Sequence, residues 1–253
     1  MRTAGIVIIG DEILTGKFAD ENAAFLIHEL RALGVDLRRI DIIPDDVADI
    51  AATVAAASAR FDYVFTSGGV GPTHDDVTMA GIAAAFNTTV MRHVGLEAKV
   101  RAYYGATLAE ANLRLAEIPI GAALLYGQDK IWPVVAMRNV HILPGVPTLF
   151  RRKFVDIRDR FRDQPMTVAR LYLDCDEGDI ADIMTAIVAT FPAVRLGSYP
   201  RFSERDFKVM VTFEGLDASS VTAAWQALTD AVGPRLVRTQ PPTLTEASPS
   251  PIT

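Results

Sequence analysis

Residues 65–78 read FTSGGVGPTHDDVT, and within this short stretch a strand end, a glycine-rich loop and a helix start follow one another. The run before the glycines is apolar and β-prone, which predicts a buried strand, and residues 77–86 carry apolar side chains at helical spacing. Gly68, Gly69 and Gly71 can adopt positive φ and lack a Cβ atom, so their backbone N–H groups could converge on a ligand. The N-terminus of the following helix adds partial positive charge. We therefore interpret the loop as an anion-binding and metal-binding site.

Strand and helix patterns alternate along the first half of the chain. Strands are predicted at residues 4–9, 36–43 and 62–65, and helices at residues 20–33, 46–59 and 77–86. The strands read as continuous apolar runs such as IVII, which is typical of a parallel sheet covered by helices on both faces. Further helices are predicted at residues 94–117 and 148–162, and two tightly joined strands at residues 134–137 and 140–143. We predict a three-layer α/β/α domain with a mostly parallel sheet over residues 1–165.

The remaining sequence predicts a second, smaller module. Its pattern is strand, helix, strand, strand, helix, strand, at residues 167–174, 179–190, 194–198, 207–213, 219–232 and 235–238. This βαββαβ order is typical of a ferredoxin-like α+β module, which we assign to residues 166–238. A core of about 70 residues is only marginally stable, so we expect the module to pack on the first domain or on a second subunit. Residues 239–253 are rich in Pro, Ser and Thr, and we predict a disordered tail there.

The composition restricts the classes of protein to which the chain can belong. The formal net charge is −6 and no basic tract stands out, so we expect no nucleic-acid partner. A single cysteine, Cys175, excludes an internal disulfide, and its strand-like surroundings favour an inert buried thiol. The N-terminal apolar run is too short to span a bilayer and lacks the layout of a signal peptide. We therefore expect a cytoplasmic protein without a membrane partner.

Three polar loops follow the predicted parallel strands and should share one rim of the sheet, where ligands of such sheets bind. They cover residues 10–16, 44–46 and 67–76. Asp45 and Asp76 each follow a strand end, and one or two carboxylates together with substrate phosphate oxygens can hold a divalent cation. We predict Mg²⁺ or Co²⁺ there, with Asp75 as a third candidate ligand. The alternative is that Asp76 and Asp45 cap the helices that follow them.

Other residues of the rim complete the candidate site. The predicted phosphate- and substrate-binding residues are Gly68, Gly69, Gly71, Thr73, Thr78, Gly10, Glu12, Gly16, Asn22, Pro144 and Gly145. Glu12 could hold a ribose hydroxyl or a metal, and Gly16 could permit close approach of a ligand, whereas capping and turn formation are the alternatives for that loop. Pro144 and Gly145 could form a wall of the cleft or merely end a strand. His74 could carry a proton or bind a metal, although a lone loop histidine is more often solvated.

Three motifs together resemble the molybdopterin-binding (MoaB/Mog-like) family, namely TSGGVGPTHDDVT at residues 66–78, GDEILTG at residues 10–16 with Asn22, and LPGVP at residues 143–147. Within that family, the chain is similar to the N-terminal region of CinA-type competence-damage proteins and to the molybdopterin-binding-like domain of eukaryotic FAD synthase. The resemblance covers about residues 4–165, and the second module is similar to the small region that follows this domain in the same relatives. It implies a three-layer α/β/α fold and a site for a pterin or for nucleotide phosphates with a divalent cation.

The resemblance also implies residue roles and an assembly state. Acidic residues of the molybdopterin adenylyltransferases occupy the positions that Asp45 and Asp76 match, and these are the two residues that the strand ends indicate independently. CinA-like and FAD-synthase-like relatives are instead associated with metal-dependent hydrolysis of the pyrophosphate in ADP-ribose or FAD. Relatives form dimers or trimers, so the resemblance predicts a homo-oligomer.

The chain departs from the CinA pattern in one segment. CinA-type sequences usually carry Asn-Pro and then Gly-Thr-Ala-Pro-Gly before the Leu-Pro-Gly strand, whereas residues 126–135 read YGQDKIWPVV, which is closer to the FAD-synthase version. The sequence also ends without the amide-hydrolysing domain of full-length CinA and without the nucleotidyltransferase domain of FAD synthase. FAD synthesis is therefore not expected.

Three functions follow from these patterns. The first is a divalent-metal-dependent hydrolase of a nucleotide pyrophosphate, in which Asp76 and Asp45 hold the metal and the glycines bind a phosphate. The second is pterin binding or adenylyl transfer in molybdenum cofactor biosynthesis. The third is a non-catalytic nucleotide-binding protein. In each case the partner is a small molecule, either a nucleotide or a pterin.

Overall fold

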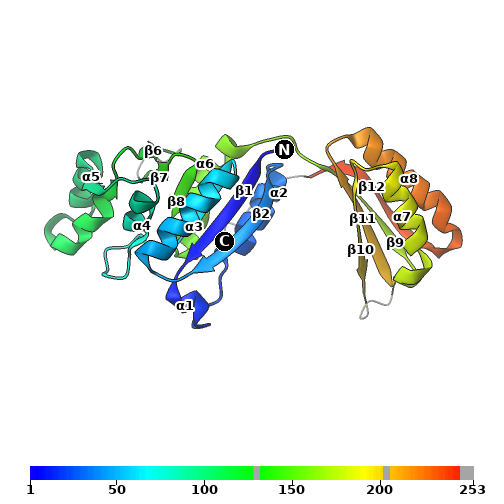
Figure 1. Ribbon diagram of the computed structural model, residues 1–253, viewed down its shortest axis with the longest axis horizontal. Coiled ribbons are helices and arrows are strands. Elements are labelled where there is room, and N and C mark those ends of the chain that lie inside the picture. Colours follow the sequence, from blue (N-terminus) through cyan, green and yellow to red (C-terminus); the bar gives the residue numbers. More distant parts are fainter. Residues whose placement is uncertain (128–131, 202–205, 246–253) are drawn as a thin grey trace. The chain divides into compact units, whose positions relative to one another are not determined.

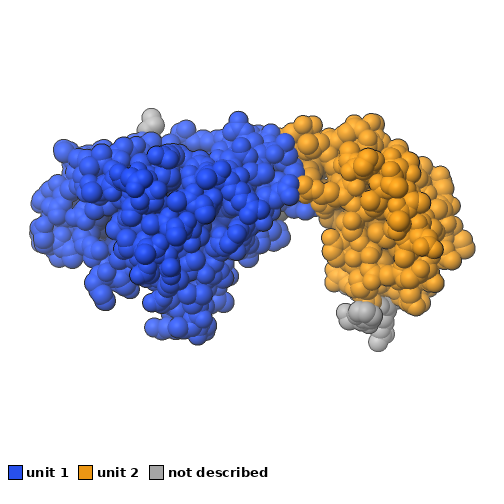
Figure 2. Space-filling model, in the orientation of Figure 1, with its two compact units in different colours: residues 1–163 blue, residues 164–253 orange. Residues whose placement is uncertain are grey.

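The computed structural model describes residues 1–127, 132–201 and 206–245, and the chain forms two compact units. Unit 1 comprises Met1–Asp163 and unit 2 comprises Gln164–Thr253 (Figure 1, Figure 2). Part of the segment that differs from the CinA pattern, residues 128–131, lies outside the described residues. None of the helices in the described ranges combines the length and the apolarity that crossing a membrane requires.

A six-stranded sheet forms the centre of unit 1, in the order β2-β1-β3-β8-β7-β6. Its strands are β1 (Thr3–Ile9), β2 (Asp36–Ile43), β3 (Tyr63–Ser67), β6 (Ala123–Leu125), β7 (Val134–Met137) and β8 (Val140–Leu143). The strands β2, β1, β3 and β8 run parallel, and β7 and β6 extend the sheet with antiparallel pairing. The predicted mostly parallel α/β sheet is therefore confirmed. The tight turn between β7 and β8 places Arg138 at a positive φ of 54°.

Helices cover both faces of this sheet (Figure 1). They are α1 (Asp11–Leu14), α2 (Asn22–Ala32), α3 (Val47–Arg60), α4 (Thr78–Ala85), α5 (Val94–Tyr104) and α6 (Pro147–Ile157). Side chains alternate along β1, so Ile6 and Ile8 pack in the core that holds α2 and α6, whereas Val7 and Ile9 pack in the core that holds α3 and α4. Burial on both faces accounts for the continuous Val and Ile content of the strands.

The predicted helix over residues 94–117 is confirmed for residues 94–104 and is wrong beyond them. Helix α5 ends at Tyr104 because Gly105 turns the chain at φ 51°, a backbone conformation that costs glycine little. Two 3-10 segments follow, at Gly105–Thr107 and Glu110–Ala116. The strand β5 (Glu117–Pro119) then pairs with β4 (Val90–Arg92) in a small antiparallel sheet.

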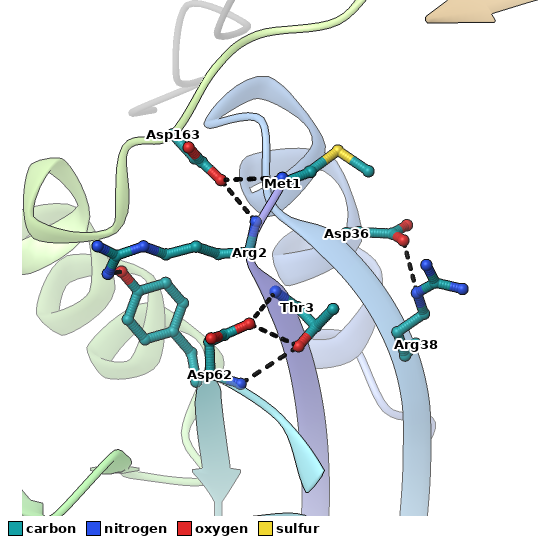
Figure 3. Close-up of polar contacts among 8 residues, drawn as sticks. Met1, Arg2, Thr3, Asp36, Arg38, Asp62 and Asp163 are labelled. Atoms are coloured by element: carbon teal, nitrogen blue, oxygen red, sulfur yellow. Dashed lines mark hydrogen bonds and ion pairs between the residues drawn. The ribbon is translucent and has the colours of Figure 1, made fainter. Parts of the chain in front are cut away.

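Polar contacts tie the start of β1 to neighbouring segments of unit 1 (Figure 3). Thr3 donates hydrogen bonds from its backbone N–H and from its hydroxyl to Asp62 Oδ2, each at 2.7 Å. These bonds, the backbone one foremost, hold the pKa of Asp62 below its usual value. The Arg2 N–H donates to Asp163 Oδ2 at 2.5 Å. The contacts fix β1 beside β3 from the first residues onward, so the carboxyl ends of the parallel strands meet at one rim.

A four-stranded antiparallel sheet, in the order β10-β11-β9-β12, forms the centre of unit 2. Its elements are β9 (Thr167–Leu173), α7 (Ala181–Thr190), β10 (Arg195–Pro200), β11 (Val209–Gly215), α8 (Ala218–Val232) and β12 (Leu236–Leu244). The predicted βαββαβ module is confirmed. Its single apolar core contains Cys175, and burial raises the pKa of this thiol, as expected of an inert side chain.

The predicted disordered tail is wrong for its first six residues, because β12 continues to Leu244 and pairs with β9 along this length. Pro241 and Pro242 lie at a register shift of the ladder, where a strand can accommodate residues without an N–H donor. Backbone pairing at a sheet edge requires little apolar burial, so the Pro- and Thr-rich composition concealed this strand. Residues 246–253 lie outside the described residues.

Candidate functional site

The glycine loop, residues 68–77, joins β3 to α4 at the rim where the parallel strands end. Gly68 has φ 107°, and a Cβ atom there would lie 2.1 Å from the carbonyl oxygen of Ile9. Gly69 has φ 62°, and a Cβ atom there would lie 2.3 Å from Thr78 Oγ1. The Thr78 hydroxyl donates to the Gly68 carbonyl at 2.9 Å, and the Thr78 N–H donates to the Gly69 carbonyl at 3.0 Å. Thr78 is fully buried, so it supports the loop instead of facing a ligand as predicted.

Only some of the predicted anion-binding amides of this loop are available. The Gly68 N–H donates to the Leu143 carbonyl at 3.2 Å, and the Gly71 N–H donates at 2.6 Å to a carboxylate within the loop. Within the described ranges, the N–H groups of Gly69 and Val70 have no protein acceptor. The first turn of α4 is not capped by a side chain either. These two amides and the start of α4 are therefore the groups that could bind an anion.

Asp76 holds the glycine loop in shape. Its Oδ1 accepts from the Gly71 N–H at 2.6 Å, and its Oδ2 accepts from the Thr73 N–H at 2.9 Å and from the Thr73 hydroxyl at 2.6 Å. A carboxylate offers about four lone-pair positions, and three of those of Asp76 are thus occupied. The residue that caps α4 is Val77, so the alternative role of Asp76 as a helix cap is wrong. Asp76 and Thr73 organise the loop and leave one acceptor position for a cation or ligand.

Asp45 lies between the first rim loop and the glycine loop. Its Oδ2 accepts from the Asp11 N–H at 3.0 Å, and its Oδ1 lies 3.3 Å from the position of a Cβ atom on Gly69. Partial burial raises the pKa of Asp45. The hydrogen bond from Asp11 opposes this shift, whereas the negative charges of Glu12, Asp11 and Asp75 add to it. We call these four carboxylates, Asp11, Glu12, Asp45 and Asp75, the acidic rim.

The acidic rim is a concentration of negative charge and not a preformed metal cage. Across the part of the chain that the structure describes, no group of three or more His, Cys, Asp or Glu could hold a metal ion by itself. Helix α3 is capped by Asp46, so Asp45 has no capping role. His74 is 99% exposed, with its Nδ1 atom 3.8 Å from Asp75 Oδ1, as the solvated alternative predicted. Asp45 is the carboxylate whose surroundings fit a cation that ligand oxygens also coordinate.

The first rim loop is closed by its own contacts. The Gly10 N–H donates to the Ile43 carbonyl at 3.1 Å, and a Cβ atom on Gly10 would lie 2.8 Å from each carboxylate oxygen of Glu12. Glu12 thus folds back over Gly10, where its charge acts on Asp45. No atom lies within 4 Å of a Cβ position on Gly16, whose φ is 72°. This glycine provides the positive φ of the turn, and the space beside it is open.

Asn22 and Gly145 support the glycine loop from behind. The Asn22 side chain is 3% exposed and donates from Nδ2 to Ser67 Oγ at 2.9 Å and to the Gly145 carbonyl at 2.8 Å. A Cβ atom on Gly145 would lie 3.2 Å from the Cα atom of Gly68. Pro144 directly precedes this contact, at the end of β8. The predicted cleft residues are brought together, and they position the loop.

The sequence patterns gave no indication of Arg114, which clamps the glycine loop from the segment Glu110–Ala116. Its Nη1 donates to the carbonyls of Pro72, at 3.3 Å, and Thr73, and its Nη2 donates to the Asp76 carbonyl at 3.2 Å. A pocket of about 60 Å³ lies beside it, and its lining includes Gly69, Val70, Asp76, Met79 and Ala80. The pocket adjoins the available amides and the uncapped start of α4, which could bind an anionic group, and Glu117 lines it as well.

Comparisons with known proteins agree with this architecture. The family model described as a probable molybdopterin binding domain matches residues 5–162, and the model described as the middle domain of FAD synthase matches residues 165–240. A protein of Caenorhabditis elegans named probable FAD synthase is 36% identical over 93% of this chain and 51% of its own length. A protein of Archaeoglobus fulgidus is 34% identical over 87% of this chain and 93% of its own length. The chain spans about half the length of the FAD synthases that it matches.

A solved structure supports the same assignment. The crystal structure of the protein CinA from Thermoplasma acidophilum, described there as of unknown function, has a TM-score of 0.58 and 28% identity, and the match covers 64% of this chain and all of that one. The resemblance carried by the three motifs is therefore confirmed. Because the first family model covers more than half of its residues, the chain belongs to the probable molybdopterin-binding domain family.

Proposed function

We propose that this chain is a divalent-metal-dependent hydrolase of a nucleotide pyrophosphate, of the ADP-ribose or FAD class. The observation that carries the proposal is that Gly69 lies between a pocket with free backbone amides and a group of carboxylates. This residue lines the small pocket beside Arg114, and its Cβ position lies 3.3 Å from Asp45 in the acidic rim. A nucleotide diphosphate that carries a divalent cation needs both a cation-binding carboxylate and donors for phosphate oxygens.

Each residue group has a distinct role in this proposal. Asp45 holds the cation, the rest of the acidic rim adds negative potential, and Asp76 contributes its remaining acceptor position. The N–H groups of Gly69 and Val70 and the start of α4 bind phosphate oxygens. Arg114 keeps the loop in the conformation that presents these groups. When bound, the cation supplies Lewis acidity and charge neutralisation for the attack of water on phosphorus.

The raised pKa of Asp45 supports the choice of this residue. Partial burial and, after it, neighbouring negative charges disfavour its ionised form, and a bound cation would relieve the repulsion between the charges. Oxygen ligands of this kind suit Mg²⁺, which usually takes one or two carboxylates and completes its coordination with substrate phosphates and water.

The test compares two adjacent aspartates. The purified chain is incubated with ADP-ribose or FAD and with Mg²⁺ or Co²⁺, and cleavage products are separated by chromatography. Asp45→Asn should lower kcat/KM roughly a hundredfold or more, about 3 kcal/mol of transition-state stabilisation. The matched control is Asp46→Asn, because asparagine also caps helices well and α3 should keep its N-cap. Metal-independent turnover, or equal activity of the two variants, would contradict the proposal.

The second candidate function is pterin binding or adenylyl transfer in molybdenum cofactor biosynthesis, which the description of the matching family favours. Its test is complementation of a strain that lacks the adenylyltransferase. Growth that depends on this chain and fails with Asp45→Asn would favour adenylyl transfer, and failure of the well-expressed chain would remove it. Tight nucleotide binding without turnover would instead favour the non-catalytic alternative.

A further inference from the structure

The strand β2 forms one edge of the unit 1 sheet. It pairs with β1 along one side and is the terminal strand of the sheet order. Two of its apolar side chains, Ile40 and Ile42, are 39% and 45% exposed. A long edge strand with exposed apolar residues is an association site unless its charges prevent pairing. The arrangement of Arg38, Arg39 and Asp41 therefore decides what this edge can do.

The charges of β2 are self-complementary. The strand reads DLRRIDII, with an arginine directly before Ile40 and an aspartate directly after it. If two copies pair antiparallel with Ile40 opposite Ile40, then Arg39 of each copy lies opposite Asp41 of the other. Opposite charges in directly facing positions stabilise antiparallel pairs, and this register brings no like charges face to face. It also places the exposed isoleucine side chains of the two copies together.

The backbone of β2 is oriented for the same register. The Ile43 carbonyl accepts from the Gly10 N–H, so the polar groups of Ile43 point toward the strand that pairs with β2. Because successive residues of a strand alternate, the N–H and C=O groups of Ile40 and Ile42 point away from the sheet. In the register centred on Ile40, the two Ile40 residues form a hydrogen-bonded pair. The Arg39–Asp41 pairs are then of the closer, non-hydrogen-bonded type, with Cα atoms about 4.5 Å apart.

One side of the edge strand leaves room for a partner. On the α3 side, a hollow of about 310 Å³ is lined by Arg39, Asp41, Arg60 and Phe61 among others. On the strand itself, Arg38 pairs with Asp36 at 2.5 Å, and Figure 3 shows both side chains beside β2. Arg39 already contacts Asp41 of its own strand at 2.8 Å, so the pairing of two copies exchanges the two ion pairs within the strands for two equivalent pairs between them.

We propose that β2 is a homodimer interface, at which a second copy of this chain adds its own β2 antiparallel and makes one continuous sheet across a two-fold axis. Such an interface is isologous, because the same patch of each copy meets itself. We assign a second copy as the occupant because the facing charges match when the strand pairs with itself, and because each copy brings the same exposed isoleucines.

Variants that reverse or exchange the charges of Arg39 and Asp41 test the register in which the two β2 strands pair. Sedimentation equilibrium of the full chain over a concentration series should give a dimer. Arg39→Asp and Asp41→Arg should each weaken dimerisation about tenfold, since each puts like charges opposite each other at two symmetry-related positions. The double variant restores both facing pairs, and its dissociation constant should return to that of the wild type. A monomeric wild type, or single variants that dimerise as well as the wild type, would overturn the proposal.

Cross-linking tests the same register without changing a charge. In a Cys175→Ala background, Ile40→Cys should form an intermolecular disulfide under mild oxidation, because facing Cα atoms of a hydrogen-bonded pair lie about 5.5 Å apart. The matched control is Val188→Cys on α7, a position of similar exposure in unit 2. Equal cross-linking of both variants, or none at Ile40→Cys, would contradict the two-fold pairing.

Discussion

The glycine loop and the acidic rim are neighbours that differ in how their polar groups are paired. The groups of the loop are paired by hydrogen bonds, whereas the rim holds several negative charges close together. In the glycine loop, Gly68, Gly71 and Asp76 form hydrogen bonds within the protein, and Thr78 and Arg114 bind the loop carbonyls. In the acidic rim, partial burial and then the negative charges of neighbouring carboxylates raise the pKa of Asp45. Most polar groups of the glycine loop thus have hydrogen-bond partners within the protein. The acidic rim instead holds negative charge that a bound cation could neutralise.

This difference separates residues that a motif presents together. Asp45 and Asp76 match the same family pattern and follow equivalent strand ends, yet Asp76 is held by three hydrogen bonds of its own loop. Asp45 instead lies where burial and neighbouring negative charges disfavour its ionised form. Folded proteins tolerate such environments mainly at functional sites, where a ligand or cation compensates them. Asp76 instead positions the loop whose free amides are proposed to bind phosphate oxygens. The comparison therefore favours Asp45 over Asp76 as the main ligand of the proposed cation.

The largest expected effect concerns the scaffold. Gly68→Ala should lower the free energy of unfolding of unit 1 by about 4 kcal/mol, because the residue has φ 107° and its Cβ atom would meet a backbone oxygen. Gly16→Ala, at φ 72° in open space, should cost about 1–2 kcal/mol. Urea denaturation followed by Trp132 fluorescence in a Trp225→Phe chain measures both. Equal costs would mean that the glycine loop is no tighter than the first rim loop.

The dependence of stability on pH should differ in sign between two groups, His141 near the glycine loop and Asp45 in the acidic rim. His141 lies on β8 opposite Phe65 of β3, beneath the glycine loop, and burial lowers its pKa from 6.5 to about 4. The unfolded chain therefore binds more protons in this interval, so stability is complete above pH 6.5 and decreases as the pH falls toward 4, by up to about 3 kcal/mol. The raised pKa of Asp45 acts in the opposite direction, since its protonation favours the folded state.

The variant His141→Phe isolates the contribution of the histidine. The aromatic surroundings of Phe65 and Phe161 should accept the new ring, and the loss of stability between pH 6.5 and 4 should become smaller. The measurement is the urea midpoint as a function of pH for the wild type and the variant. An unchanged slope would show that another group controls the acid sensitivity of unit 1.

The architecture of both units could be predicted because the sequence patterns that indicate it lie within each strand, helix or loop. Continuous Val and Ile runs identify buried parallel strands, and the glycines of residues 68–71 identify the loop that joins β3 to α4. The failures have equally local causes. Gly105 ended a helix that the apolar spacing extended to residue 117, and backbone pairing with β9 ordered a Pro-rich strand.

The roles of individual carboxylates could not be predicted, because they depend on partners distant in sequence. Asp45 and Asp46 are adjacent and identical in type, and only the folded structure shows that Asp46 caps α3 while Asp45 reaches the Asp11 amide. Arg114 contacts the glycine loop from a segment far along the chain, and no motif marks it. Spacing and propensity place such residues near a site but do not choose their hydrogen-bond partners.

The smallest expected effects distinguish the two aspartates most directly. Asp76→Ala leaves the Gly71 and Thr73 donors without their acceptor and should cost about 2 kcal/mol. Asp45→Ala removes a charge that its neighbours disfavour, so the change in stability should stay below about 0.5 kcal/mol or be slightly stabilising. The same urea experiment measures both variants. A larger loss for Asp45→Ala than for Asp76→Ala would reverse the assignment of scaffold and ligand site.

The effect of added cation on the melting temperature gives a second comparison of the Asp45 and Asp76 variants. This measurement does not require enzymatic turnover. A cation that binds only the folded state raises the melting temperature in proportion to the logarithm of its concentration. Mg²⁺ or Co²⁺ should therefore stabilise the wild type, and Asp76→Ala should retain a measurable part of this shift, whereas Asp45→Ala should lose it. Loss of the shift in both variants would mean that the ordered glycine loop is itself part of the cation site, and retention in both would exclude Asp45 as its main ligand.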